Sequence, residues 1–152
     1  MNTGTGVPSF TSDPRHRRLV PVLVPLLADT CPSDAGGHGG AFEVRLPFAE
    51  VEELGGLDLF RSALRSAGRS LGWKVETYGV AGVETIAGVV DRREVPAEYT
   101  DAVEQHMGVK KRAAIERAGL FTAAKRAGAS IDPPPGAVAA ERLREALAAA
   151  QG

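Results

Sequence analysis

The chain has 152 residues, of which 43% are hydrophobic, and its formal net charge is −1. This length favours a single domain with a buried core, and the near-neutral charge excludes a protein that coats nucleic acid with its whole surface. The single cysteine, Cys31, excludes an internal disulfide and a cysteine-based zinc site.

Residues 1–18 are expected to form a disordered leader, because few of the first residues are apolar. The leader ends in a basic cluster at residues 15–18, which is interpreted either as a solvated surface or as a phosphate contact. Residues 19–27 are apolar, but Pro21 and Pro25 each remove an amide donor from any helix. We therefore expect an extended edge strand or a polyproline segment there, not a helix.

The same apolar run is too short to cross a bilayer, which takes about 20 residues. No signal-peptide pattern precedes it. The lone cysteine fits a reducing compartment. We therefore expect a cytoplasmic protein that does not associate with membranes.

A glycine-rich run at residues 36–40 ends the next loop. Glycine runs bind phosphate when a Lys-Ser or Lys-Thr pair follows and opens a helix. Here neither pair follows and a strand is expected next. This run is therefore predicted to be a flexible connector.

Three strands are predicted between residues 42 and 90. Residues 42–48 alternate apolar and polar, and Pro47 indicates that the strand either lies at an edge or ends there. Residues 73–78 and 83–90 form the other two, joined as a hairpin through the glycines at 79 and 82. The strand at 83–90 is the more apolar and is expected in the centre of the sheet.

A helix is predicted over residues 58–71, where apolar side chains recur at helical spacing. Asp58 is expected to be its N-cap, and Gly72 is expected to end it. These elements define an α+β fold, with a small, mostly antiparallel sheet in a β-α-β-β core at residues 42–90. The helix covers this sheet, residues 19–24 are a candidate fourth strand, and a C-terminal helical region follows.

Three arginines, Arg61, Arg65 and Arg69, follow one another at four-residue spacing along this helix. This spacing stacks them in one stripe. Guanidinium groups match phosphate oxygens in a bidentate way, so the stripe is a candidate anion-binding face. The alternatives are a solvated face and pairing with the acidic residues at 50, 52 and 53.

Residues 97–118 have the outline of a helix-turn-helix, with Gly108 in the turn and Lys110, Lys111 and Arg112 opening the second helix. Glu104 stands where that motif needs a small residue. An ordinary helical hairpin with a charged exterior is therefore the alternative. Gly119 and Gly128 are expected to break the later helical pieces.

The expected domain organisation has four parts: the leader at 1–18, the α+β core at 19–95, a basic helical segment at 96–130, and a proline-marked linker with a C-terminal helix at 131–152. Residues 137–150 form that last helix, with Val138, Leu143 and Leu147 as its apolar set. It is expected either to pack back onto the domain or to dock on a second copy of the chain.

No catalytic or metal-binding pattern is present in the sequence. The histidines, His16, His38 and His106, lack metal-ligand spacing and are expected at the surface. Cys31 has no evident base beside it. We therefore expect no enzymatic activity, no cofactor and no metal.

Local charge gives the best indication of function. Residues 109–130 carry six Lys or Arg residues against one Glu, and residues 42–58 carry five acidic residues against one Arg. The sequence therefore favours a non-enzymatic nucleic-acid-associated protein, accessory or regulatory, that binds DNA or another polyanion through phosphate contacts. The candidate contacts are Lys110, Lys111, Arg112, Arg117, Lys125, Arg126, Arg61, Arg65 and Arg69. The alternative is a protein–protein interaction module, or a homodimer, that uses the acidic edge and the C-terminal helix.

Overall fold

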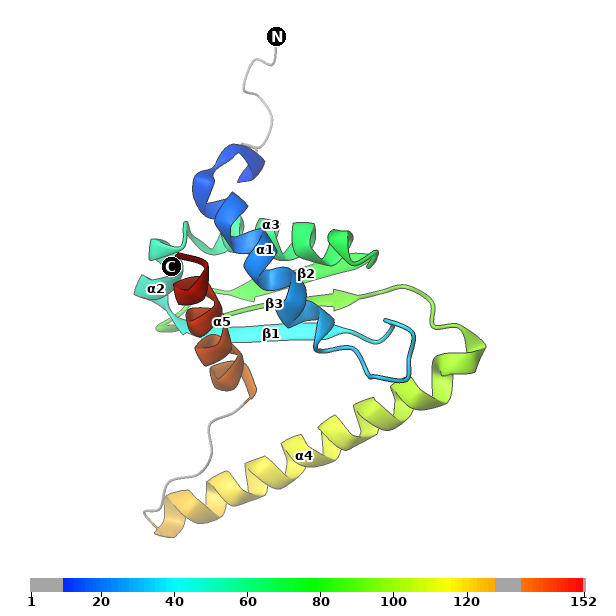
Figure 1. Ribbon diagram of the computed structural model, residues 1–152. Coiled ribbons are helices and arrows are strands. Elements are labelled where there is room, and N and C mark those ends of the chain that lie inside the picture. The colour runs from blue at the N-terminus through cyan, green and yellow to red at the C-terminus, as the bar shows by residue number, and fades with distance from the viewer. Residues whose placement is uncertain (1–9, 128–134, 152) are drawn as a thin grey trace.

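The computed structural model describes residues 10–127 and 135–151, except for the side chains of residues 113, 114, 117–127, 135 and 151. A short 3₁₀ helix, η1 (Phe10–Ser12), precedes α1 (Pro14–Ala28), β1 (Ala41–Pro47), α2 (Phe48–Glu53) and α3 (Leu57–Ser70). Then come β2 (Val75–Val80), β3 (Glu84–Asp91), the 3₁₀ helix η2 (Ala97–Tyr99), α4 (Thr100–Ala127) and α5 (Pro135–Gln151). The predicted α+β class is confirmed (Figure 1).

The three strands form an antiparallel sheet in the order β1-β3-β2. Each predicted strand is found within two residues of its expected bounds, with β3 in the centre and β1 at an edge. Helices α1, α3 and α5 cover one face of the sheet (Figure 1). The candidate fourth strand at residues 19–24 is absent, because those residues are part of α1.

The core lies between the sheet and these three helices. Alternation along β1 buries Phe42, Val44 and Leu46, which point towards the helices. The helices contribute large side chains with relative exposures of 1% or less: Leu19, Leu23, Leu27, Leu59, Phe60, Leu64 and Leu143.

The expectation of an extended segment at residues 19–27 is wrong, because α1 runs without interruption from Pro14 to Ala28. This helix also includes residues 14–18 of the expected leader. Asp13 caps its start by accepting a hydrogen bond from the Arg15 amide (2.8 Å). Pro21 and Pro25 both lie on the solvent side, while Leu19, Leu23 and Leu27 are buried. The carbonyls of Arg17 and Pro21, which lose a helical partner to the prolines four residues on, belong to exposed residues. Core packing outweighs the cost of the two prolines.

Helix α3 confirms the predicted helix but begins differently. Its N-cap is Gly56, which makes no side-chain cap, and Asp58 lies inside the first turn, so the predicted Asp58 cap is wrong. Its end is as predicted: Gly72 has φ +80°. The Trp73 amide donates to the Gly68 carbonyl (3.0 Å) and the Gly72 amide to the Arg69 carbonyl (2.9 Å), which is a Schellman motif.

A single continuous helix, α4, is present where either a helix-turn-helix or a helical hairpin was expected. It continues for 28 residues through Gly108 and Gly119, so neither glycine forms the expected break. Gly108 has no positive φ, and a Cβ added there would meet nothing within 4 Å. One glycine in a long helix costs only about 1 kcal/mol, which its helix-forming neighbours offset. Gly128 lies outside the described residues.

Helix α5 packs back onto the domain, which was one of its two expected positions. Leu143 and Leu147 are buried in contact with the core, whereas Val138 is exposed. On the surface, Arg144 donates two hydrogen bonds of 2.7 Å to the carboxylate of Glu50. This bidentate ion pair joins α5 to α2.

Candidate functional site

The structure separates the predicted cations into two groups. Helix α3, with Arg61, Arg65 and Arg69, lies over β2 and β3. Helix α4, with Lys110, Lys111 and Arg112, lies beyond the opposite edge of the sheet, on the side of β1 (Figure 1). The two groups therefore belong to different surfaces of the molecule.

The α3 group lies along the outer edge of β2, which pairs only with β3. Arg61 and Arg65 are partly buried, and both donate to the hydroxyl of Thr77 on β2. The distances to Thr77 Oγ1 are 3.4 Å from Arg61 Nε, 3.3 Å from Arg61 Nη2 and 3.0 Å from Arg65 Nη1. Arg61 Nη2 also lies 3.3 Å from the Thr77 carbonyl oxygen. One threonine therefore supplies every hydrogen bond that the described residues make to these two guanidinium groups.

No ion pair neutralises the α3 stripe within the part of the chain that the structure describes. Pairing with the acids at 50, 52 and 53, one of the alternatives for this stripe, is not found among the described residues; Glu50 pairs with Arg144 instead. Several arginines elsewhere do have a carboxylate partner, for example Arg92 with Glu76 and Arg93 with Asp91. The α3 stripe thus differs in having its positive charge uncompensated.

The pKa of Arg65 shows this lack of compensation. Burial lowers the pKa of Arg65 from its ordinary value, and the charges of Arg61 and Arg69 lower it further, against a weaker opposing effect of Asp58. Arg61 and Arg69 thus repel the positive charge of Arg65. An anion placed beside Thr77 would relieve this repulsion.

The α4 group is exposed and makes no ion pair among the described side chains. Lys110, Lys111 and Arg112 are all at the surface. Successive helical residues are rotated by about 100°, so these three project to different sides of the helix. Arg117, Lys125 and Arg126 belong to the same helix, but their side chains lie outside the described residues.

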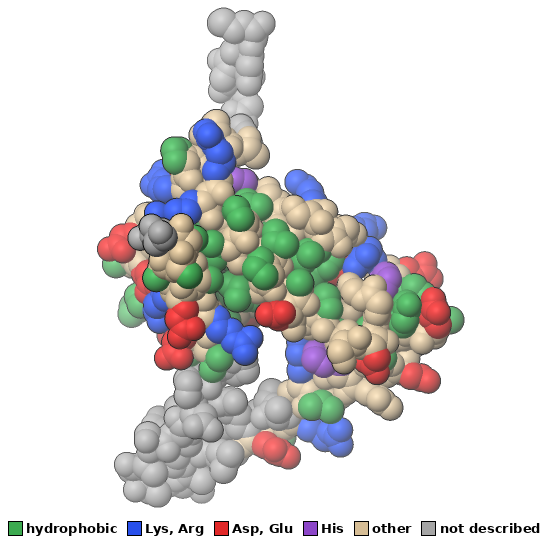
Figure 2. Space-filling model, viewed as in Figure 1, with side chains coloured by type: hydrophobic (Ala, Val, Ile, Leu, Met, Phe, Trp, Pro, Cys, Tyr) green, Lys and Arg blue, Asp and Glu red, His purple; other side chains and the backbone are tan. Residues whose placement is uncertain are grey.

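Among the side chains of α4 that the structure describes, Val103 in the first turns is the buried one. Val103 is buried against the loop before β1, where a Cβ on Gly39 would lie 3.1 Å from it. Beyond it, Met107 is 62% and Ile115 is 63% exposed. Figure 2 shows an opening between the body of the molecule and the described part of α4. The basic residues 110–112 are therefore accessible.

The histidines do not form a site. His16 is 3% exposed, so its expected surface position is wrong; its Nε2 lies 3.3 Å from Ser62 Oγ between α1 and α3. His38 stacks on Tyr99, with ring centroids 5.9 Å apart. Burial and then Lys110 lower the pKa of His106. In the described parts of the chain, no three His, Cys, Asp or Glu side chains are grouped so that they could hold a metal ion.

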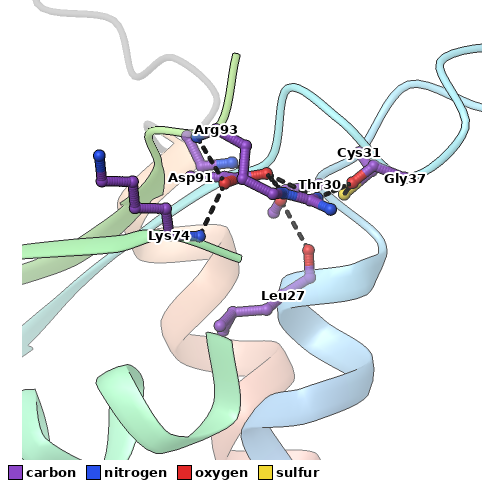
Figure 3. A network of polar contacts seen from close by, with 8 residues as sticks. Leu27, Thr30, Cys31, Gly37, Lys74, Asp91 and Arg93 are labelled. Atoms are coloured by element: carbon purple, nitrogen blue, oxygen red, sulfur yellow. Dashed lines mark hydrogen bonds and ion pairs between the residues drawn. The ribbon is translucent and has the colours of Figure 1, made fainter. Parts of the chain in front are cut away.

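A polar clamp holds the glycine-rich loop against the ends of β2 and β3 (Figure 3). Asp91 Oδ1 accepts hydrogen bonds from the Lys74 amide (3.1 Å) and the Arg93 amide (3.0 Å), and Oδ2 accepts from Arg93 Nε (2.8 Å). Arg93 Nη2 also donates to the Gly37 carbonyl (2.8 Å). The predicted flexible connector is thus tied to the sheet. A charged pair two residues apart at a strand end was the only sequence signal for this clamp.

Cys31 lies beside the clamp, where its Sγ is 3.5 Å from the Gly37 carbonyl oxygen. Burial, followed by the charge of Asp91, raises the pKa of the Cys31 thiol. A raised pKa lowers the thiolate fraction, which disfavours a nucleophilic role.

The chain matches no family model, and neither curated proteins nor solved structures include a match to it. None of the helices that the structure describes has the length and apolar character needed to cross a membrane. Function must therefore be argued from the two cation groups and the surfaces around them.

Proposed function

We propose that this protein is a non-enzymatic nucleic-acid-associated protein, accessory or regulatory, that binds phosphates through the basic part of α4. The observation that carries the proposal is the free-standing α4: a continuous helix whose Lys110, Lys111 and Arg112 are exposed and unpaired among the described side chains. Three further cations, Arg117, Lys125 and Arg126, follow in the same helix.

A continuous basic helix suits a duplex without a helix-turn-helix. In some DNA-binding proteins a single uninterrupted basic helix lies in the major groove. The cations on both sides of such a helix then lie near the phosphates of the two groove walls. Cations that project to different sides of α4 fit that arrangement, because both groove walls carry phosphates. The expected contacts are electrostatic and independent of base sequence.

The alternative function, a protein-binding module that uses the acidic edge and the C-terminal helix, has less support. Leu143 and Leu147 of α5 are buried in the core, and Glu50 of the acidic run pairs with Arg144. Both features are thus engaged within the chain.

The test is a titration of the full chain against short duplex and single-stranded DNA over a series of salt concentrations. Replacing Lys110, Lys111 and Arg112 with alanine should weaken binding and reduce the slope of log affinity against log salt by about 2 to 3, since each phosphate contact contributes about 0.7 to 0.9. The matched control replaces three exposed cations elsewhere, Arg18, Lys74 and Arg142, and removes the same charge.

Two results would contradict the proposal. One is absence of binding at low salt, where the electrostatic attraction is strongest. The other is an equal loss in the α4 variant and in the control, because this would mean that total charge, and not α4, determines the affinity.

A further inference from the structure

The outer edge of β2 has free backbone hydrogen-bonding groups next to the uncompensated arginines of α3. The Lys74 carbonyl accepts a hydrogen bond from the Arg92 amide (2.7 Å), which makes 74–92 a hydrogen-bonded pair. By antiparallel alternation, residues 76, 78 and 80 also direct their amides and carbonyls towards β3. Val75, Thr77 and Gly79 therefore direct theirs outward, away from the sheet.

The side chains of Val75 and Thr77, and the position that a Cβ would take on Gly79, point to the face that α3 covers. Val75, Thr77 and Gly79 are partly buried, and Glu76, Tyr78 and Val80 are exposed on the opposite face. A Cβ on Gly79 would lie 3.0 Å from Arg61 Cδ, so the Arg61 side chain runs directly over the strand. The open edge and the cationic stripe thus form one surface.

We infer that this surface binds an extended acidic peptide segment of a partner protein, which adds to the sheet as a fourth strand beside β2. Strand addition satisfies both the outward amides and the outward carbonyls, whereas a phosphate accepts hydrogen bonds and cannot pair with a carbonyl. The mixed donors and acceptors of the edge therefore favour a peptide over nucleic acid.

The spacing of the arginines specifies the pattern of the peptide. Four residues of helix advance about 6 Å, and two residues of strand advance about 6.4–6.8 Å. Arg61, Arg65 and Arg69 are therefore nearly in register with every second residue of an added strand. Acidic side chains at alternate positions would meet the stripe, and the residues between them would lie beside Tyr78 and Val80, where apolar or β-branched side chains fit.

Arg61 is positioned to accept such a ligand. Its contacts with Thr77, at 3.3 to 3.4 Å, are longer than a normal hydrogen bond of about 2.7–3.2 Å. A carboxylate offers the same guanidinium a shorter, charge-assisted bond. Its movement towards an acidic side chain would also release the Thr77 carbonyl for pairing.

A second copy of this chain does not fit the edge. Two-fold pairing of β2 with β2 would place both α3 helices on the same face of a continuous sheet. The two stripes of three arginines would then face each other across the junction without carboxylates between them. Charged residues at a sheet edge are a common means of preventing this self-association.

The first experiment measures binding of a labelled peptide with glutamate at every second position and valine or threonine between, by fluorescence anisotropy with the full chain. The control peptide has the same composition with its glutamates in one block. The alternating peptide should bind at least several-fold more tightly. Equal affinities would overturn the proposal, because they would show attraction by charge alone.

Two variants locate the site. Arg65→Ala should lower the affinity for the alternating peptide by about 10-fold, the loss expected for a charge-assisted hydrogen bond. Arg69 is exposed and makes no described contact, so Arg69→Ala tests the stripe without risk to the fold and should also weaken binding severalfold. Arg142→Ala, which removes an exposed cation from α5, is the matched control. An equal effect of Arg142→Ala would overturn the proposal.

Amide hydrogen exchange distinguishes strand addition from a purely ionic complex. Peptide binding should slow exchange at Val75, Thr77 and Gly79 and leave residues 76, 78 and 80 unchanged, since these already bond to β3. Single-stranded DNA of the same charge is the comparison ligand. If the three amides gain no protection, or if DNA protects them equally, the peptide assignment is wrong.

Discussion

The carboxylate of Asp91 shows how one residue can fix a loop. Its side chain is 1% exposed, yet it is charged and accepts hydrogen bonds from Lys74 and Arg93. Burial by itself would raise the pKa of Asp91, but the hydrogen bonds from the Arg93 side chain, the Arg93 amide and the Lys74 amide hold it below its ordinary value.

This lowered pKa predicts how stability depends on pH. A carboxyl whose pKa is lower in the folded state than the unfolded value of about 3.9 stabilises the fold above that pH, and the contribution is lost as pH falls through the folded pKa. Asp91→Asn should therefore lower the free energy of unfolding at pH 7 by about 1–3 kcal/mol. At pH 3 the difference from the wild type should be smaller.

Urea denaturation at the two pH values measures this difference. Glu53→Gln, at an exposed carboxylate without a described ion pair, is the control and should change stability by less than about 0.5 kcal/mol. A constant difference between wild type and Asp91→Asn from pH 7 to pH 3 would show that the charge of Asp91 is not what stabilises the clamp.

Among the elements, α4 is longer and more continuous than its sequence outline predicts. Gly108 is placed where a helix-turn-helix has its turn, but it lies inside an uninterrupted helix with open space around its Cα. The two arrangements respond oppositely to an added methyl group. A turn glycine with positive φ resists replacement, whereas a mid-helix glycine costs about 1 kcal/mol relative to alanine.

Gly108→Ala should therefore increase the helicity of α4 and stabilise it locally by about 1 kcal/mol. The measurement is amide hydrogen exchange along α4, with far-UV circular dichroism as a second readout. Because the side chains described around Gly108 are exposed, global unfolding would report little of the change. Faster exchange in the variant would argue for a turn at residue 108.

For the whole molecule, the main consequence is that the two cation groups act independently. The α3 group lies over β2, and the α4 group lies beyond the β1 edge of the sheet (Figure 1). Distant sites without shared partners contribute additively. The alanine variant at Lys110, Lys111 and Arg112 should lose DNA affinity but bind the acidic peptide as the wild type does. Arg69→Ala should lose affinity for the acidic peptide but bind DNA as the wild type does.

Measuring both ligands against both variants and their combination tests this independence. In the combined variant, the changes in binding free energy should add within about 0.5 kcal/mol. If either single variant lost binding of both ligands, one common surface, or a change of fold, would explain both losses.

Patterns imposed by burial predicted the elements of this fold well, whereas the rules for single prolines and glycines did not. Period-two and helical patterns located β1, β2, β3 and α3 to within two residues, because burial on one face imposes those patterns directly. The rules for proline and glycine failed at Pro21, Pro25 and Gly108. They describe local backbone cost, and a helix that is well packed or long can outweigh that cost.

The site was less accessible to sequence analysis than the fold. Spacing alone identified the Arg61, Arg65 and Arg69 stripe. Thr77 contacts two of these arginines because α3 packs on β2, and no local sequence pattern specifies that packing. The burial of His16 against Ser62 was missed for the same reason. With an extended segment expected at residues 19–27, no interface between α1 and α3 was predicted.

The docking of α5 on β1 has a consequence for how the molecule is made. Leu143 packs into a core formed mainly by residues roughly one hundred positions earlier in the chain, and contacts between such distant residues form slowly. During synthesis, at about 5–20 residues per second, α1, the sheet and α3 emerge from the ribosome several seconds before α5. Each nascent chain thus passes through a stage in which the apolar surface beneath α5 is open to water and to any chaperone that binds such surfaces.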